Sequence, residues 1–192
     1  PRGRAGRSVC GIAGILGGSG AAEERSVRCM LDALVHRGPD QEGLWTGSGA
    51  ILGHRRLSIL DLSEAGRQPM IDPRTGCAIV FNGEVYNFGE LRAELEREGR
   101  RFVSGSDTEV VLAAYATWGE EATARLRGMF ALAVWDPRTR RTTIARDRLG
   151  IKPLYFIARP GSFAFASELR ALLAAELAPR RLDPLALEAY LW

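Results

Sequence analysis

The chain has 192 residues, of which 46% are hydrophobic and 26% are charged, the balance of a globular protein with a full core. The 26 basic and 23 acidic residues leave a net charge of +3. Part of this charge lies in residues 1–9, so the rest of the chain shows no basic footprint for nucleic acid. No run approaches the ~20 apolar residues of a membrane span, and no signal-peptide core follows residues 1–9, so we expect no membrane partner.

The predicted elements of the first half begin with an apolar strand that starts at Cys10 and is broken by Gly17–Gly20. A helix follows, with Val27, Met30 and Leu31 on one face. The expected elements are a strand at 10–16, a helix at 23–34, a loop at 36–41, strands at 43–46 and 50–59, irregular chain at 61–75, and a strand at 77–82 that ends at Gly83.

The second half begins with two helices, of which the second opens with a capping box formed by Ser106 and Glu109. The expected elements are helices at 87–98 and from 106 through 118, then strands at 129–136, 141–147, 153–158 and 162–167. Asp183-Pro184 is a good helix start, and this last helix reaches Trp192 without a C-cap. We therefore expect a linker and the start of a further domain at 179–192, although a trimmed C-terminal helix is an alternative.

The strand at 129–136 is apolar on both faces, which indicates a layered fold. Phe130, Leu132 and Val134 alternate with Ala131, Ala133 and Trp135. A strand with two apolar faces is covered on both sides. Because short turns join the last four strands, the sheets are expected to be largely antiparallel. The sequence therefore predicts an α+β sandwich in which helices cover one face of a sheet and a second sheet covers the other.

Cys10 is the residue with the clearest chemical potential. If it became the first residue, its α-amine, with a pKa of ~8, would be the base that activates its thiol. A lone cysteine on an apolar strand is nevertheless more often a core residue. The three cysteines fit neither a disulfide framework nor a zinc site, so we expect a reducing cytoplasm, with Cys29 and Cys77 in structural roles.

Residues 1–9 separate Cys10 from the start of the sequence. Val9 directly precedes Cys10, and a GTG start codon, which initiates with methionine, can be printed as valine. We therefore expect translation to begin at Val9, with a genuine leader or an expression remnant as the alternatives. While residues 1–9 remain attached, the nitrogen of Cys10 is an amide that cannot act as a base, so we expect that form to be inactive.

Six short motifs occur in a fixed order along the chain. They are CGIAG at 10–14, HRGPD at 36–40, GHRRLSI at 53–59, NGEVYN at 82–87, GSDTE at 105–109 and RDRLGIKPLY at 146–155. This series resembles the class II glutamine amidotransferases, which are N-terminal nucleophile hydrolases. Within them it is most similar to the glutaminase domain of glutamine-hydrolysing asparagine synthetases. The resemblance extends from Cys10 to about Glu168.

The resemblance implies a four-layer αββα sandwich and a set of residue roles. Cys10 matches the nucleophile that attacks the side-chain amide of L-glutamine, and Asn82 and Gly83 match the oxyanion hole. The implied substrate-binding residues are Arg56, Leu57, Ile59, Asn82, Gly83, Glu84 and Asp107. Arg56 would bind the α-carboxylate, because its guanidinium grips a carboxylate in a bidentate manner. Glu84 and Asp107 would lie near the α-ammonium.

The resemblance also implies a partner. The expected glutaminase domain at 10–178 would use no cofactor or metal and would supply ammonia to a C-terminal synthetase domain that binds ATP and magnesium. The acceptor carboxylate, aspartate or another, is not determined by this sequence, and a homodimer is possible. Arg55 stands where many relatives carry Glu. The alternative is a non-catalytic, N-terminally blocked domain used for binding or docking.

Overall fold

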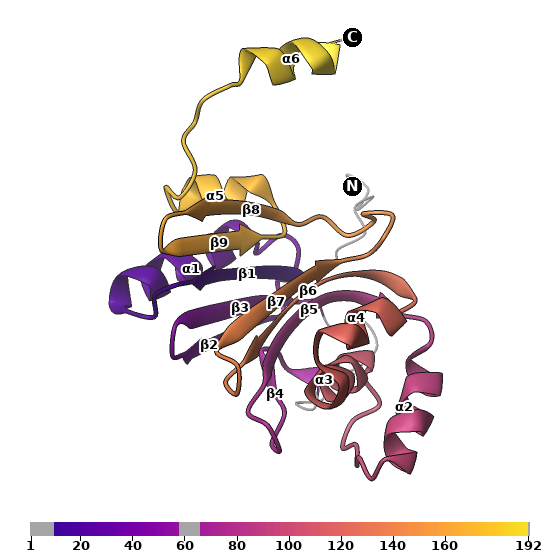
Figure 1. The fold of residues 1–192 in the computed structure, drawn as a ribbon. Helices are drawn as coiled ribbons and strands as arrows, with labels where there is room; N and C mark the ends of the chain where they lie inside the picture. The colour runs from indigo at the N-terminus through magenta and orange to yellow at the C-terminus, as the bar shows by residue number, and fades with distance from the viewer. Residues whose placement is uncertain (1–9, 58–65, 192) are drawn as a thin grey trace.

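The computed structural model describes residues 10–57 and 66–191, which form two sheets packed face to face with helices outside each (Figure 1). The first sheet has the order β2 (Gln41–Gly47), β3 (Ala50–Arg56), β1 (Gly11–Leu16), β9 (Ser162–Ala166), β8 (Tyr155–Arg159). The second has the order β4 (Met70–Ile71), β5 (Ala78–Val85), β6 (Gly128–Asp136), β7 (Arg141–Arg146). Every described strand pair is antiparallel.

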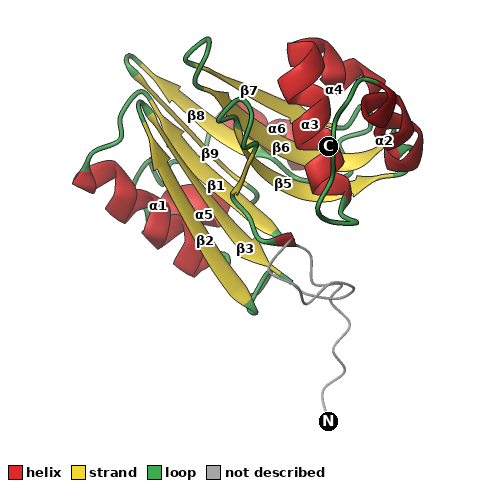
Figure 2. Ribbon diagram, turned by 90° about the horizontal axis from the view of Figure 1, so that it is seen from below, coloured by secondary structure: helices red, strands yellow, loops and turns green. Residues whose placement is uncertain are grey.

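The helices that pack on the sheets form the two outer layers. The view from below shows them on the outer sides of the two sheets (Figure 2). The first sheet is covered by α1 (Ala21–Ala33) and α5 (Leu169–Ala174), and the second by α2 (Phe88–Arg97) and α3 (Asp107–Trp118). The remaining described helices are the 3-10 turn η2 (Gly119–Glu121), α4 (Ala122–Arg125) and α6 (Pro184–Leu191). The expected four-layer αββα sandwich is confirmed.

Alternation along each strand explains why the layers form. On β1, Ala13 and Ile15 pack against α1 and α5, whereas Ile12 faces the second sheet. On β6, Phe130, Leu132 and Val134 join the helix-covered core, and Ala131, Ala133 and Trp135 join the core between the sheets. Successive side chains of a strand point to opposite faces, so one apolar strand contributes to two cores. The interpretation of residues 129–136 is confirmed.

β5 is longer than the sequence predicts. The expected end at Gly83 is wrong, because pairing with β6 continues from Asn82 opposite Ala131 to Val85 opposite Gly128. Gly83 therefore lies within the strand. A Cβ at Gly83 would come 2.2 Å from the carbonyl oxygen of Met129, so glycine permits this close approach of the two strands.

Several local predictions need correction. Ser106 caps α3 by accepting a hydrogen bond from the Glu109 N–H at 3.3 Å, but the Glu109 carboxylate binds the N–H groups of Val103 and Ser104 instead of closing a capping box. Residues 61–75, expected to be irregular, contain β4, and α4 and α5 were not predicted. These elements have two, four and six residues, too few to show a periodic pattern.

The end of the described chain forms a separate helix. The Asp183 carboxylate accepts a hydrogen bond from the Leu185 N–H at 2.9 Å, which confirms the predicted start of α6. All described residues of α6 are exposed, and an extended segment separates it from the sandwich (Figure 1). Within residues 10–57 and 66–191, no helix combines the length and apolarity needed to span a bilayer.

Candidate active site

Cys10 lies directly before β1, at the end of the first sheet where β3 finishes. Gly11 pairs with Arg55, so the residues that follow Arg55 come alongside the cysteine. The N–H of Leu57 faces the Cys10 sulfur, and the charge of Arg56 acts on it. The structure therefore brings three of the predicted site residues together at one corner of the sandwich.

Burial governs the chemistry of this thiol. It raises the pKa of the Cys10 thiol, and the Leu57 N–H and the positive charges of Arg56 and Lys152 offset only part of that effect. A thiol with a raised pKa stays protonated near neutral pH. Since the thiolate is the nucleophile, Cys10 needs a base to become reactive.

His54 connects this corner to the second sheet. It pairs with Ile12 across β1 and β3, and its Nε2 lies 3.2 Å from the carbonyl oxygen of Phe81 on β5. Burial lowers the pKa of His54 to about 3, so the ring is neutral and Nε2 carries the proton that it donates to Phe81. This bond places Asn82, the residue after Phe81, opposite the beginning of β1.

Asn82 carries an unsatisfied hydrogen-bond donor. Its side chain is 1% exposed, and its Nδ2 is buried with no hydrogen-bond partner in the described chain. A buried donor without a partner costs about 1–3 kcal/mol of folding free energy, so native structures rarely keep one without a reason. The Asn82 amide thus keeps a donor in reserve for an acceptor such as a ligand oxygen.

Glu84 lies near the C-terminal end of β5, and Asp107 of α3 contacts that end of the strand. Asp107 begins α3, and its Oδ2 accepts a hydrogen bond of 3.0 Å from the N–H of Val85. Burial raises the pKa of Asp107, as does the nearby negative charge of Glu84, while the Val85 N–H lowers it. The two carboxylates are therefore close enough for the charge of Glu84 to act on Asp107.

Arg56 is the predicted cation of the site. It is 8% exposed, and its Nη1 donates to the Oε1 of Gln41 at 3.2 Å. Its neighbour Arg55 points elsewhere, where it forms ion pairs with Asp32 at 3.2 Å and Glu42 at 2.6 Å on the outer part of the first sheet. The predicted site residue Ile59 lies outside the described residues.

Two residues near Cys10 were quoted in motifs but given no role. Arg37 is buried, and its Nε donates to the carbonyl oxygen of Cys10 at 3.0 Å. Lys152, the only lysine of the sequence, is 8% exposed, and its charge reaches the Cys10 thiol. A basic residue in a loop motif gives no sign in the sequence that the fold will bury it beside a cysteine.

Asp147 explains how Lys152 reaches the site. Its carboxylate accepts hydrogen bonds from the N–H groups of Ile151 at 2.8 Å, Lys152 at 3.0 Å and Phe130 at 3.2 Å. Although burial alone would raise the pKa of Asp147, these N–H groups hold it below its usual value. Phe130 lies on β6 and pairs with Gly83 on β5. The Asp147 carboxylate therefore ties the loop after β7 to β6, next to the β5 segment that carries Asn82.

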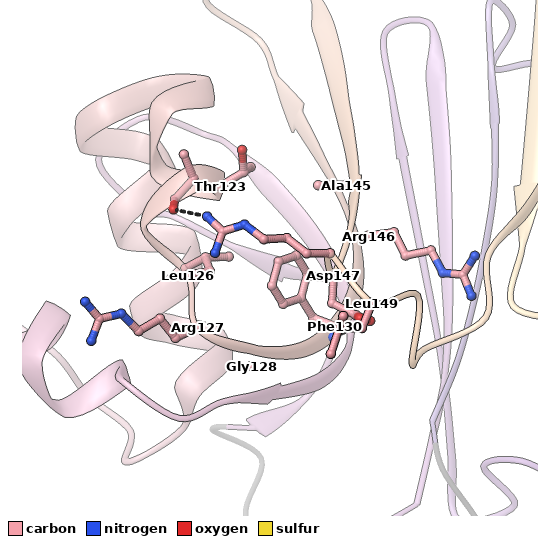
Figure 3. A pocket seen from close by; sticks show the side chains of 11 residues that line it. Thr123, Leu126, Arg127, Gly128, Phe130, Ala145, Arg146, Asp147 and Leu149 are labelled. Carbon is pink, nitrogen blue, oxygen red and sulfur yellow. Dashed lines mark hydrogen bonds between the residues drawn. The ribbon is translucent and has the colours of Figure 1, made fainter.

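A cavity of about 440 Å³ lies elsewhere, between α4 and the ends of β6 and β7 (Figure 3). None of the predicted site residues lines it. Arg127 and Arg146 point to opposite sides of it (Figure 3), and Arg148 donates to the Ala124 carbonyl at 3.0 Å. Its arginines therefore do not converge on an anion. Within the described chain, no group of three or more His, Cys, Asp or Glu residues is arranged to hold a metal ion.

Comparisons with known proteins identify the family of the chain. The family model described as a glutamine amidotransferase domain matches residues 9–192. The glutamine-hydrolyzing asparagine synthetase 3 of Bacillus subtilis is 43% identical over 154 residues, covering 79% of this chain and 25% of that protein. A putative glutamine-hydrolyzing asparagine synthetase of Mycobacterium bovis is 40% identical over 174 residues, covering 86% of this chain and 27% of that protein. The chain thus spans about a quarter of these relatives' length.

Solved structures share the fold. The glutamine phosphoribosylpyrophosphate amidotransferase of Bacillus subtilis superposes with a TM-score of 0.72 at 22% identity, covering 87% of this chain and 44% of that chain. A structure described as the allosteric regulatory enzyme of purine biosynthesis superposes with a TM-score of 0.71 at 21% identity, covering 87% of this chain and 43% of that chain. At these identities the likeness concerns the fold alone.

Proposed function

Because the chain belongs to the glutamine amidotransferase domain family, we propose that it hydrolyses the side-chain amide of L-glutamine through a Cys10 thioester. The observation that carries the proposal is the buried Nδ2 of Asn82, which has no hydrogen-bond partner among residues 10–57 and 66–191 and lies opposite the beginning of β1. Such a donor destabilises the fold until an acceptor satisfies it, and the oxyanion of the proposed reaction would be that acceptor.

Glutamine binding follows from the charges of the site. Free glutamine is a zwitterion, so a selective pocket needs a cation for the carboxylate and an anion for the ammonium. Arg56 would grip the α-carboxylate, and Asp107 with Glu84 would hold the α-ammonium. The ammonium would favour the ionised form of Asp107, whose pKa is raised in the ligand-free protein. Leu57 and Ile59 would complete the pocket.

The reaction begins when the base takes the proton of the Cys10 thiol and the sulfur attacks the amide carbon. The carbonyl oxygen becomes an oxyanion that accepts hydrogen bonds from Asn82 Nδ2 and the Gly83 N–H. Collapse of this intermediate breaks the C–N bond, and the protonated base gives its proton to the leaving nitrogen, which departs as ammonia. Water then attacks the thioester, with its proton taken by the same base, to release glutamate and restore the thiol.

The base that fits this site is the α-amine of Cys10 itself. In the described chain, the His54 Nε2 proton is committed to the Phe81 carbonyl, and the His36 ring contacts Glu168 and Arg170. Neither histidine is thus placed to take the thiol proton. An α-amine with a pKa of ~8 would do so at neutral pH, provided that Cys10 is the first residue.

The fate of the ammonia depends on a second domain. The asparagine synthetase relatives are about four times longer than the matched segment, which covers 25% and 27% of their length. We propose that a C-terminal synthetase domain, which would bind ATP and magnesium, uses the ammonia to amidate a carboxylate. The three free cysteines are compatible with the reducing compartment predicted from the sequence.

The test is glutamate release from glutamine, measured with residues 1–9 present and with Cys10 as the first residue. Only the second form should turn over, and Cys10→Ala should abolish its activity. An electrophilic glutamine analogue should label Cys10 and leave Cys29 and Cys77 unmodified, since Cys77 is fully buried and the Cys29 thiol contacts the Ala174 carbonyl at 3.2 Å. Equal turnover by both forms would exclude the α-amine as base, and no turnover by either would favour the binding or docking alternative.

A further inference from the structure

Two consecutive residues after β9 hold the backbone that follows Cys10. Ser167 is fully buried, and its hydroxyl accepts a hydrogen bond of 2.9 Å from the Ile12 N–H. Its own N–H donates to the Ile12 carbonyl oxygen at 2.8 Å. The regular pairing of β1 with β9 begins only at Ala13 opposite Ala166. Ser167 therefore extends the ladder by one residue toward Cys10, using its side chain as the acceptor.

Glu168 reaches Cys10 itself through one intermediate. Its Oε1 lies 2.9 Å from Nη1 of Arg37, whose Nε donates to the Cys10 carbonyl oxygen at 3.0 Å. The guanidinium is planar and rigid, so fixing Nη1 also fixes the direction in which Nε points. Glu168 thus determines where the donor to the Cys10 carbonyl lies.

The Glu168 carboxylate is itself held from several sides. His36 Nε2 lies 2.9 Å from Oε1, and Arg170 Nε lies 2.7 Å from Oε2. Burial would raise the pKa of Glu168, but the bonds from Arg37 and His36 keep it below its usual value. The carboxylate is therefore ionised and fixed near neutral pH, as an anchor for a buried guanidinium must be.

A purely structural role in the following helix does not account for this arrangement. Glu168 occupies the N-cap position of α5, yet its side chain makes no capping hydrogen bond. A surface ion pair would also leave the guanidinium in solvent, whereas the Arg37 side chain is only 10% exposed. The carboxylate therefore leaves the backbone N–H groups of α5 uncapped and instead bridges Arg170 of that helix to Arg37, the residue that binds Cys10.

We propose that Ser167 and Glu168 are positioning residues for the nucleophile, Ser167 through Ile12 and Glu168 through Arg37. The proposal rests on the proposed function, in which Cys10 is the first residue and is joined to the protein on its C-terminal side only. Chain ends are poorly ordered unless they are tied down. A misplacement of about 1 Å at a reacting group costs roughly 10²-fold in rate, so a terminal nucleophile needs the restraint that these residues supply.

The experiment compares Glu168→Gln and Ser167→Ala with a matched control, Glu94→Gln. Glu94 also pairs with an arginine, Arg125 at 2.6 Å, but on the outer helices of the second sheet. Three quantities are measured: the rate of Cys10 alkylation by iodoacetamide, kcat for glutamate release, and the Kd for glutamine in a Cys10→Ala background. We expect Glu168→Gln and Ser167→Ala to lower the first two by about 10- to 10²-fold, with the Kd and the control unchanged.

A double-mutant cycle on Arg37 and Glu168, read out by the rate of Cys10 alkylation, tests whether Glu168 acts through Arg37. If Glu168 acts through Arg37, the variant that combines Arg37→Lys with Glu168→Gln should alkylate no more slowly than Arg37→Lys alone. Independent, multiplying effects would overturn the proposal, as would wild-type alkylation and kcat in Glu168→Gln. Glu168→Asp, which keeps the negative charge, should recover part of both rates.

The two proposals fail in different ways. If the wild-type protein with Cys10 first releases no glutamate, the proposed function fails, while slower alkylation in Glu168→Gln and Ser167→Ala would still support positioning. If the wild-type protein hydrolyses glutamine and these variants alkylate at its rate, the positioning proposal fails and the proposed function stands.

Discussion

Replacing Asn82 by leucine should separate catalysis from stability. Leucine has the same branched arrangement of side-chain heavy atoms as asparagine and removes the Nδ2 donor, which is buried and lacks a hydrogen-bond partner in the described chain. Loss of one oxyanion donor raises the barrier by about 3–4 kcal/mol, which is a decrease of roughly 10²- to 10³-fold in kcat. Loss of a buried unsatisfied donor recovers part of a desolvation penalty of about 1–3 kcal/mol. We therefore expect a much slower enzyme that is as stable as wild type, or more so.

The assay pairs glutamate release under saturating glutamine with urea unfolding of the same preparations. Asn82→Asp serves as a comparison, because a carboxylate at this position would repel the oxyanion and add a buried charge, lowering both activity and stability. Wild-type kcat in Asn82→Leu would refute the oxyanion role. If the free energy of unfolding falls by as much as the catalytic barrier rises, the amide has a structural partner. The reasoning from its unpartnered nitrogen would then be wrong.

Three further predictions follow from the charges around the site. Asp107→Asn should raise KM for glutamine by at least ~30-fold, about 2 kcal/mol, because the α-ammonium loses a buried charge partner. Thermal stability should stay intact, since the new amide oxygen can still accept the Val85 N–H. An unchanged KM would remove Asp107 from the pocket. Lys152→Met should shift the pH profile of Cys10 alkylation to higher pH, since it removes a charge that lowers the pKa of the thiol, and Lys152→Arg should restore it; identical profiles would contradict this. The folded-state pKa of Asp147 is lowered, so its contribution to stability is present above the unfolded pKa and lost as pH falls through the folded pKa. Asp147→Asn should then cost about 2–3 kcal/mol in urea at pH 7 and reduce the stability lost on acidification, whereas an unchanged pH dependence would count against the carboxylate.

Much of the fold could be predicted because each strand carries its own pattern. The alternation of Phe130, Leu132 and Val134 with Ala131, Ala133 and Trp135 requires cover on both faces, and the structure supplies helices on one and a sheet on the other. The end of β5 could not be predicted in the same way. Asn82-Gly83 has the composition of a turn, and only the continued pairing with β6 shows that it lies within a strand.

The candidate site divides along similar lines. Cys10, Arg56, Asn82 and Asp107 belong to motifs whose order is visible in the chain. The structure places Arg56 near Cys10 and ties Asp107 to β5, the strand that carries Asn82. The positions of Lys152 and Glu168 depend on contacts between segments more than a hundred residues apart, such as Arg37 with Glu168. No local propensity or periodicity records such a contact.

The amino-acid sequence by itself therefore determined the layered architecture and the family, and it predicted the nucleophile and the pocket residues, because periodicity and ordered motifs are local properties of a chain. Only the tertiary structure decided that Asn82 Nδ2 is buried without a partner in the described part of the chain, that burial raises the pKa of the Cys10 thiol, and that Ser167 and Glu168 hold the segment beginning at Cys10. Solvent exclusion and the direction of a hydrogen bond arise when distant segments pack together, so they exist only in the folded molecule.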